Sequence, residues 1–456
     1  MNTICMESGF VSLNKDGEDL CGDFFTTVSD EDGVSTFVLS DGMGSGVKAN
    51  ILATLTAKIL ATMTANRLSL RDSVSTIAQT LPVCSVRGLA YSTFTLMQVQ
   101  PDWQVYLAQY DNPLAILLRQ GKSVDYPKER LVLGDKTIVE SRFALEGGDV
   151  FVLMTDGVTH AGLGGLIPDG WQRQGVQDYL EEIYRPKMSA KSLAARLADA
   201  CRDLYLEHIA DDVTVAAFKM RTRQAVNLLV GPPKHRQDDE RFLRQFLSSE
   251  GAHIVCGGST AQMVSRCLDR QLVVSDDYVD PDIPPAARIR GIDLVTEGVV
   301  TLGRALDIVS RYASAESIPS HWEARGDAAT QIARMLLEDA TDIRFFVGRA
   351  VNPSHQAPEL HIDFSLKMGV IEKLEKLLRD MGKRVTVQSC YPPAPPYLYR
   401  KGFSTYGFRH SSTGIKIQSP EGGRPAGLAR PAAQGPAGGL GPPRAWPSAH
   451  HALLYL

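Results

Sequence analysis

The sequence predicts a mixed α/β protein with two folded domains and a disordered tail. Its 456 residues exceed what one ordinary hydrophobic core holds. Apolar runs of strand length alternate with stretches of helical periodicity. Beyond Cys390 the composition changes abruptly to Gly, Pro and Ala, which cannot bury enough apolar surface to offset the entropy of ordering. We therefore expect one domain over residues 1–222, a smaller α/β domain over 223–390, and a disordered tail over 391–456.

Composition indicates a globular protein without an electrostatic preference for nucleic acid or membranes. Hydrophobic residues make up 44% and charged residues 22%, and the formal net charge is only −4. The first residues lack the basic end and apolar run of a signal peptide, and no stretch is apolar enough to span a bilayer. The 7 cysteines form no CxxC pair, which argues against a disulfide framework and a thiolate zinc site. We expect a cytoplasmic protein.

In the first half, the pattern predicts a strand, loop and helix followed by an antiparallel meander. Residues 36–46, TFVLSDGMGSG, resemble a buried strand that ends in a Gly-rich turn, and residues 49–63 are helical in pattern. A helix is expected over 189–209 and a closing strand over 211–220. After the helix at residues 49–63 and before residue 189, four short β-like runs separated by turn residues are predicted, at 90–99, 103–111, 114–121 and 149–157.

In the second half, the same alternation of strand, turn and helix predicts an α/β domain. Gly257-Gly258-Ser259-Thr260 lies between the apolar HIVC and a helical stretch, an arrangement that can bind an anion through backbone N–H groups. It lacks the spacing of a dinucleotide fingerprint and the lysine of a P-loop, so a tight turn is the favoured interpretation. The Pro-rich loop around His355 is interpreted as a connector.

Four short acidic motifs occur at predicted strand ends or turns: Gly22-Asp23, Asp41-Gly42, Asp156-Gly157 and Asp211-Asp212. Hard divalent cations prefer carboxylate and carbonyl oxygens on a rigid backbone. A single Asp-Gly is usually only a turn, so the set is what indicates a metal site. If the carboxylates converge, two ions could share a water, lower its pKa and direct it at a phosphorus atom.

These motifs also carry a family resemblance. In order along the chain they are GDFF (22–25), VLSDGMGSGVKA (38–49), YSTFTL (91–96), YDNPLAIL (110–117), LMTDGV (153–158) and ADDVTV (210–215). Residues 1–222 thereby resemble bacterial SpoIIE-like phosphatases, which belong to the metal-dependent protein phosphatase class, also called protein phosphatase 2C. The resemblance implies an αββα sandwich, in which helices flank two antiparallel sheets, with the metals in a cleft at one edge.

The resemblance further implies two divalent cations, Mn²⁺ or Mg²⁺, and a role as metal ligand for each of the four aspartates. Asp41 would bridge the two ions, and Asp23 with the carbonyl of Gly42 would bind one of them. Asp156 and Asp211 would bind the other. Asp41 and Asp23 are on this basis the candidate catalytic residues.

Four further residues lie within or near these motifs: Asp212, Met43, His160 and Lys48. Asp212 is interpreted as ordering its turn. Met43 departs from eukaryotic relatives, which place there a histidine able to protonate the leaving oxygen, so a metal-bound water is the alternative acid. His160 could be that acid or could cap the next turn. Lys48 could meet a substrate phosphate or could be a solvated helical lysine, and neither His160 nor Lys48 is placed in the catalytic set.

The sequence thus favours an enzyme that hydrolyses phosphoserine or phosphothreonine in a phosphorylated regulatory protein, such as an anti-sigma factor antagonist. The alternative is a catalytically silent phosphatase fold that acts as a regulatory binding module. Retention of four mutually repelling carboxylates favours the enzyme, since cations would neutralise them. Residues 223–390 are expected to bind a partner or to regulate the first domain, for example as a small-molecule sensor that controls it. The oligomeric state is not indicated.

Overall fold

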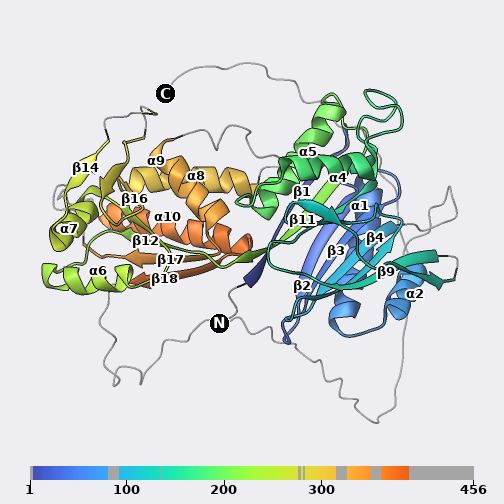
Figure 1. The fold of residues 1–456 in the computed structure, drawn as a ribbon, viewed down its shortest axis with the longest axis horizontal. Coiled ribbons are helices and arrows are strands. Elements are labelled where there is room, and N and C mark those ends of the chain that lie inside the picture. The colour runs from blue at the N-terminus through green and yellow to red at the C-terminus, as the bar shows by residue number, and fades with distance from the viewer. Residues whose placement is uncertain are drawn as a thin grey trace, which may run out of the picture. The chain divides into compact units, whose positions relative to one another are not determined.

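The computed structural model describes residues 4–80, 92–134, 136–275, 279–280, 283–314, 326–350 and 361–389 (Figure 1). The predicted tail, Tyr91 and His355 lie outside this part of the chain. Residues 1–393 form one compact unit. Among the described residues, no helix is both long and apolar enough to cross a membrane.

Two antiparallel sheets are built from residues 4–222. The six-stranded sheet has the order β2-β3-β4-β5-β9-β8, with β2 (Asp23–Ser29), β3 (Ser35–Gly42), β4 (Ser92–Val99), β5 (Gln104–Tyr110), β9 (Lys136–Ala144) and β8 (Glu129–Leu133). The five-stranded sheet has the order β1-β11-β10-β6-β7, with β1 (Ile4–Leu13), β11 (Val213–Thr222), β10 (Val150–Met154), β6 (Ile116–Arg119) and β7 (Lys122–Val124). Phe37 and Leu107 of the first sheet pack against Phe151 and Phe218 of the second.

Helices cover the outer faces of both sheets. α1 (Gly46–Ala65) and α2 (Leu70–Thr80) pack on the six-stranded sheet, and α4 (Gln172–Ile183) and α5 (Ala190–Leu204) on the five-stranded one. Figure 1 shows α4 and α5 in green beside β1 and β11. Alanines at every fourth position of α1, namely Ala49, Ala53, Ala57 and Ala61, are fully buried, so the helix approaches the sheet closely. The αββα sandwich is confirmed.

Residues 225–389 form a seven-stranded sheet with the order β14-β15-β16-β13-β12-β17-β18. The strands are β12 (Ala225–Val230), β13 (Ala252–Cys256), β14 (Leu272–Val274), β15 (Ala287–Ile289), β16 (Leu294–Thr296), β17 (Asp342–Val347) and β18 (Arg384–Ser389). The run from β16 to β18 is parallel, and β14 and β15 are antiparallel. The predicted α/β alternation is therefore confirmed.

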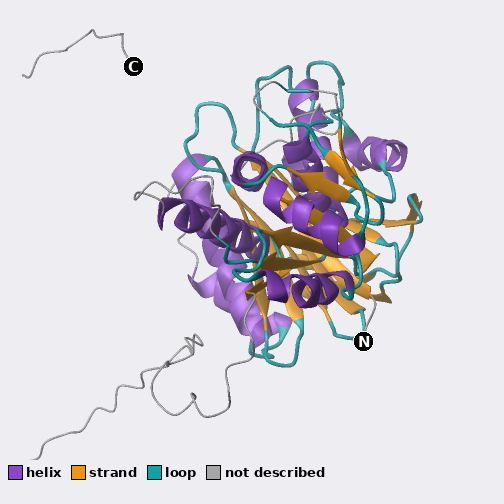
Figure 2. Cartoon of the chain, turned by 90° about the vertical axis from the view of Figure 1, so that its left-hand side faces the viewer, coloured by secondary structure: helices purple, strands orange, loops and turns teal. Residues whose placement is uncertain are grey.

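Helices also cover both faces of this sheet (Figure 2). One face carries α6 (Asp239–Leu247) and α7 (Gly258–Leu268), and the other carries α8 (Val299–Ser314), α9 (Ala328–Arg334) and α10 (His361–Asp380). A short η1 (Arg236–Asp238) precedes α6, and a π-helical turn, η3 (Met335–Asp339), follows α9. The Gly257 turn begins α7: Gly257 has φ of 113° and donates its N–H to the Thr296 carbonyl (2.9 Å).

A buried carboxylate connects the seven-stranded part to the sandwich. Glu338 of η3 is only 7% exposed and accepts hydrogen bonds from the Ser189 N–H (2.7 Å) and the Ser192 hydroxyl (2.5 Å) at the start of α5. The Tyr312 hydroxyl of α8 donates to the same carboxylate (3.3 Å). Arg221 of β11 donates to the Glu338 carbonyl (2.7 Å). Glu338 thus reinforces the N-terminal cap of a helix in the sandwich.

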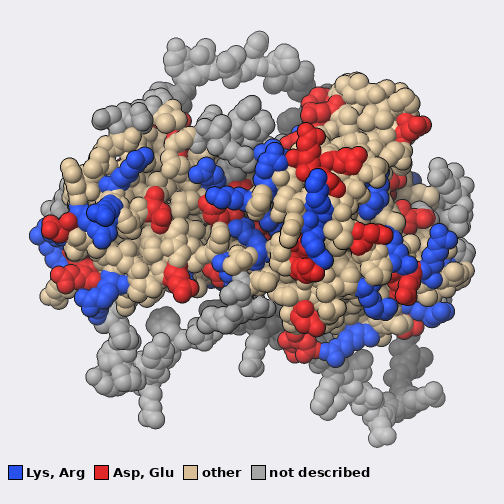
Figure 3. Space-filling model, viewed as in Figure 1, with Lys and Arg blue, Asp and Glu red and all other residues tan. Residues whose placement is uncertain are grey.

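Surface charge follows the composition. Lys and Arg side chains are interspersed with Asp and Glu over the face drawn in Figure 3, without a large patch of one sign. Within the described residues, Cys5, Cys21, Cys201, Cys256 and Cys267 are all free thiols.

Candidate metal centre

Strand register brings Asp23 and Asp41 together. Asp23 begins β2 and Asp41 lies near the end of β3, and the two are direct cross-strand partners. Directly opposed residues of an antiparallel pair point to the same face with Cβ atoms about 4.5–5.5 Å apart. Like charges in this position destabilise the sheet. The pairing therefore has a cost that a cation between the carboxylates would remove.

The other sheet contributes Asp156 and Asp211 from the ends of two paired strands. Asp156 follows β10 and begins the one-turn helix α3 (Asp156–Thr159), and Asp211 lies just before β11. Thr155 joins the two halves of the site. Its hydroxyl donates to Asp23 Oδ2 (2.8 Å) and accepts from the Thr214 N–H (2.9 Å). This bond ties the end of the five-stranded sheet to the first strand of the six-stranded one.

Two glycines of the acidic motifs are required by close backbone approach. A Cβ at Gly42 would lie 2.0 Å from the carbonyl oxygen of Ala49 in α1. A Cβ at Gly157 would lie 2.1 Å from the carbonyl oxygen of Asp212. Any side chain at either position would push these elements apart. The Asp-Gly pairs therefore let α1 and α3 approach the strand ends that carry the aspartates.

The carboxylates are close enough to perturb one another. Burial, and then the neighbouring Asp23, Asp156, Asp211 and Asp212, raise the pKa of Asp41. Burial is also the main cause that raises the pKa of Asp23, which the Thr155 hydrogen bond opposes. Burial and Asp156 raise the pKa of Asp211. In the metal-free protein the cluster therefore binds protons more tightly than isolated carboxyl groups do.

One buried oxygen of the cluster has no partner. Asp23 is 4% exposed, and its Oδ1 makes no hydrogen bond within the described part of the chain. A buried carboxylate oxygen without a donor is costly unless a cation neutralises it. The set consists of hard oxygen donors on rigid strand ends, which suits Mg²⁺ or Mn²⁺. The residues present thus fit a divalent cation.

A second group of possible ligand atoms includes a histidine. One ligand atom from each of Asp156, His160 and Asp211 lies within 4.8 Å of the others. His160 Nδ1 is 3.8 Å from Asp156 Oδ2. The sequence placed Asp156 and Asp211 in the set but left His160 outside it. Its only signal was a spacing of four residues from Asp156, which becomes a shared helical face once α3 forms.

Other residues near the cluster serve to position it. Asp212 is buried, and its Oδ1 accepts the Lys15 N–H (3.0 Å), which agrees with the predicted role in ordering a turn. The Tyr205 hydroxyl donates to the Gly157 carbonyl (2.8 Å), a contact for which the sequence carried no signal. Lys48 is exposed on α1, and Met43 is half-buried.

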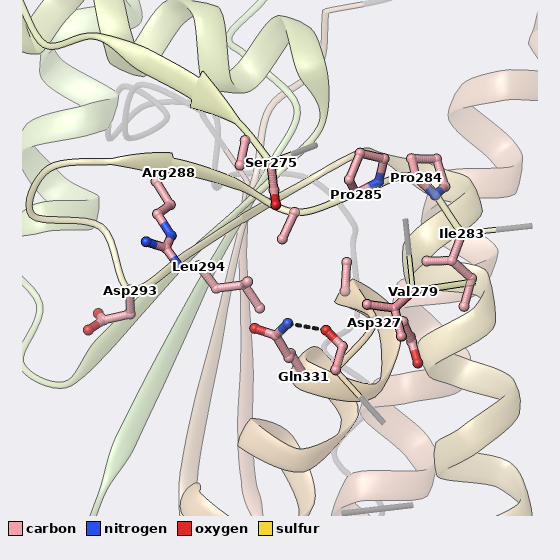
Figure 4. A pocket seen from close by; sticks show the side chains of 14 residues that line it. Ser275, Val279, Ile283, Pro284, Pro285, Arg288, Asp293, Leu294, Asp327 and Gln331 are labelled. Atoms are coloured by element: carbon pink, nitrogen blue, oxygen red, sulfur yellow. Dashed lines mark hydrogen bonds between the residues drawn. The ribbon is translucent and has the colours of Figure 1, made fainter. Parts of the chain in front are cut away.

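A separate cavity of about 320 Å³ lies beside β15 and the start of α9 (Figure 4). Its polar side chains are largely engaged in structural contacts. Asp327 caps α9 by accepting the Thr330 N–H (2.8 Å), Asp293 accepts the His253 N–H (2.7 Å), and Gln331 donates to the Gly326 carbonyl (2.5 Å). The cavity shares no residue with the acidic cluster, which remains the better candidate for chemistry.

Residues 31–221 match the family model described as Stage II sporulation protein E (SpoIIE). This segment is SpoIIE-like. The match contains Asp41, Asp156, His160 and Asp211, whereas Asp23 lies before it. SpoIIE-type domains are metal-dependent serine/threonine phosphatases of the protein phosphatase 2C class, and the acidic cluster of this one could bind a divalent metal ion.

Solved structures similar to this chain cover about half of it. The SpoIIE phosphatase domain from Bacillus subtilis is 18% identical, with 49% of this chain and 95% of that chain covered and a TM-score of 0.38. The RsbU and RsbW domains of a Mycobacterium tuberculosis protein are 17% identical, with coverage of 54% and 70% and a TM-score of 0.40. The SiaA-PP2C domain of Pseudomonas aeruginosa is 19% identical, with coverage of 46% and 85% and a TM-score of 0.39. No curated protein matches the chain.

Proposed function

We propose that the SpoIIE-type domain hydrolyses phosphoserine or phosphothreonine in a phosphorylated regulatory protein. In this proposal two divalent cations, Mn²⁺ or Mg²⁺, are held by Asp23, Asp41, Asp156, Asp211 and the carbonyl of Gly42. The observation that carries it is the unpartnered, buried Oδ1 of Asp23 at the centre of converging carboxylates. The substrate class rests on the family match of residues 31–221.

The divalent ions would supply Lewis-acid stabilisation of the phosphoryl oxygens and a nucleophilic water at neutral pH. The chain's own residues would orient the ligands. Asp41 faces Asp23 across the strands and is perturbed by Asp156 and Asp211, which suits a bridging position. Thr155 fixes Asp23 Oδ2 and leaves Oδ1 for a cation. Met43 has no proton to donate, so the leaving oxygen must receive its proton from another group.

The alternative function is a silent phosphatase fold that binds partners. A scaffold would gain nothing from opposed carboxylates at Asp23 and Asp41, because like charges across a strand pair destabilise the sheet. Replacement of either by a neutral residue would be favourable if no cation bound there. The presence of four aspartates at one site, with the pKa values of Asp23, Asp41 and Asp211 raised, therefore supports the enzyme.

A phosphopeptide assay separates these two functions. The full chain with Mn²⁺ should release phosphate from a phosphoserine peptide, and chelator or Asp41→Ala should abolish the release. Asp178→Asn, on the exposed face of α4, is the matched control and should keep full activity. Activity that survives both chelation and Asp41→Ala would exclude the metal mechanism, and an inactive but correctly folded wild-type chain would support the binding module.

We also propose that residues 1–222 are the catalytic domain and that residues 223–390 regulate it or bind a partner. Support comes from Glu338, whose carboxylate reaches across to the start of α5. α5 ends at Leu204, and the chain then continues through Tyr205 to Asp211. Rates and Mn²⁺ affinities of residues 1–222 should therefore differ from those of the full chain. Identical values in two folded proteins would remove the regulatory assignment.

A further inference from the structure

His160 lies on the same side of α3 as Asp156. Asp156 is the first residue of this single helical turn, and His160 ends it with its N–H bonded to the Asp156 carbonyl (2.8 Å). Residues four apart on a helix are neighbours, and this spacing lets two side chains share one metal ion. Asp211 reaches the same point from the loop before β11. The helical turn of α3 and the loop before β11 therefore bring one nitrogen donor and two carboxylates close together.

The distance between His160 and Asp156 is compatible with two ligands of one metal ion. His160 Nδ1 and Asp156 Oδ2 are 3.8 Å apart, whereas a charge-assisted hydrogen bond would be about 2.7–2.9 Å. Ligand bonds of about 2.1 Å place two donors on one ion about 3.0 Å apart when adjacent and about 4.2 Å apart when opposite. The observed separation falls between these values. The ligand atoms of Asp156, His160 and Asp211 all lie within 4.8 Å of one another. Only a small movement of these side chains would bring them to the distances that one ion requires.

We infer that His160 is a third protein ligand of the ion bound by Asp156 and Asp211, so that this position is a mixed nitrogen and oxygen site selective for transition-metal ions such as Mn²⁺ over Mg²⁺. This inference rests on the metal assignment of the proposed function. The unpartnered, buried Oδ1 of Asp23 separately supports a cation at the neighbouring position of the aspartate cluster.

Selectivity follows from the donor type. Imidazole nitrogen suits the later first-row divalent ions, whereas Mg²⁺ prefers oxygen ligands and retains its waters. Loss of His160 should therefore weaken the binding of Mn²⁺ much more than the binding of Mg²⁺. The competing structural role is a weak i,i+4 pair between two side chains that are 46% and 40% exposed. Such an exposed pair contributes little to stability and would not affect metal preference.

The test is pulsed electron paramagnetic resonance of Mn²⁺ bound to the untagged full chain. A directly coordinated imidazole produces ¹⁴N modulation of the Mn²⁺ echo, and the wild-type protein should show it. Incorporation of ¹⁵N-histidine should remove the ¹⁴N signal without any mutation. His160→Gln should also remove it while Mn²⁺ remains bound. His208→Gln is the matched control, because His208 is exposed and pairs with Asp16 (3.3 Å), and it should leave the signal intact.

Titrations of the same proteins with Mn²⁺ and with Mg²⁺ measure the metal selectivity. His160→Gln should weaken Mn²⁺ binding by at least the roughly tenfold that loss of an outer-shell partner costs, and should leave Mg²⁺ affinity within about twofold. Bound Mn²⁺ without ¹⁴N modulation in the wild type, or modulation that persists in His160→Gln, would overturn the inference and leave the proposed function standing. A wild-type chain that binds no Mn²⁺ would overturn both.

Discussion

Two buried carboxylate sites of this chain are built in opposite ways. At Glu338, three donors from α5 and α8 converge on one carboxylate: the Ser189 N–H, the Ser192 hydroxyl and the Tyr312 hydroxyl. At Asp23, one hydroxyl serves Oδ2, Oδ1 has no partner among the described residues, and the nearest charges are other carboxylates. Buried charge is tolerated only when it is hydrogen-bonded, paired or bound to metal. The first site is therefore complete without a cation, and the second is not.

The surroundings of the two sites differ in the same way. Close to Glu338 lie the cationic groups of Arg221, which bonds to its backbone carbonyl (2.7 Å), and Lys383, which donates to the Leu337 carbonyl (2.7 Å). The aspartate cluster instead gathers Asp41, Asp156, Asp211 and Asp212 around Asp23 or one another. Removing one carboxylate should thus have opposite effects on stability at the two sites.

The largest expected effect is at Asp41. Asp41→Asn should lower metal-dependent phosphatase activity at least about 100-fold, equivalent to about 2.7 kcal/mol of activation free energy. The same change should raise the melting temperature of the chelator-treated protein, because it removes repulsion from Asp23 and its neighbours. Activity assays and calorimetry measure the two effects. An Asp41→Asn variant that is both inactive and less stable than the metal-free wild type would contradict the contrast between the aspartate cluster and the Glu338 site.

The next effect is at Glu338, in the opposite direction. Glu338→Gln should lower the free energy of unfolding by about 1–3 kcal/mol, because a buried donor loses a charged acceptor. Urea unfolding of the full chain measures it. Glu372→Gln, at an exposed position on α10, is the control and should change stability little. A neutral outcome at Glu338 would show that its hydrogen bonds are not needed for stability.

The pH dependence of stability should separate the sites further. The raised native pKa values of Asp23, Asp41 and Asp211 mean that the folded, metal-free protein binds more protons than the unfolded chain. The difference in bound protons is present in the pH range between the ordinary carboxyl pKa of about 3.9 and the raised pKa values of the folded protein. Their contribution to stability therefore falls as pH rises through that window.

Melting temperatures between pH 5 and pH 8 test this sign. Relative to Asp41→Asn, the chelator-treated wild type should lose stability as pH rises, and saturating Mn²⁺ should remove the difference because the metal replaces the protons. Comparison with the variant cancels titrations elsewhere in the chain. Parallel pH curves for the two metal-free proteins would mean that the carboxylates do not interact as their positions require.

The smallest effect concerns Met43. Met43→His introduces a group that titrates near pH 6.5 beside Asp41 and Gly42. It should alter the alkaline side of the pH–rate profile by well under the roughly 100-fold that an aligned general acid contributes. A profile identical to the wild type would exclude an acid role for this position.

Much of the fold could be predicted because local signals agreed. The β3 strand and the Ala-rich α1 combine apolar runs with a Gly-rich turn, and both formed as expected. β9 and β8 were not predicted, since their exposed positions interrupt the apolar pattern. α4 was also missed, because only Val176 and Leu180 of its residues are buried.

The sites depended more on contacts between distant residues. The short acidic motifs indicated the aspartates. However, only strand register pairs Asp23 with Asp41, and only the turn of α3 brings His160 close to Asp211. Nothing in the MLLED segment distinguishes Glu338 from a solvated helical glutamate. Its role appears only when Ser189, Ser192 and Tyr312 converge on it from separate helices.

Equilibrium binding of Mn²⁺ to the full chain tests most directly whether the aspartate cluster is completed by cations. Free Mn²⁺ can be counted by electron paramagnetic resonance in the wild type and in Asp41→Asn, with Glu338→Gln as the control. We predict two bound ions per wild-type chain, weaker or incomplete binding in Asp41→Asn, and unchanged binding in Glu338→Gln. No binding by the wild type, or equal binding by Asp41→Asn, would contradict a metal centre at this cluster.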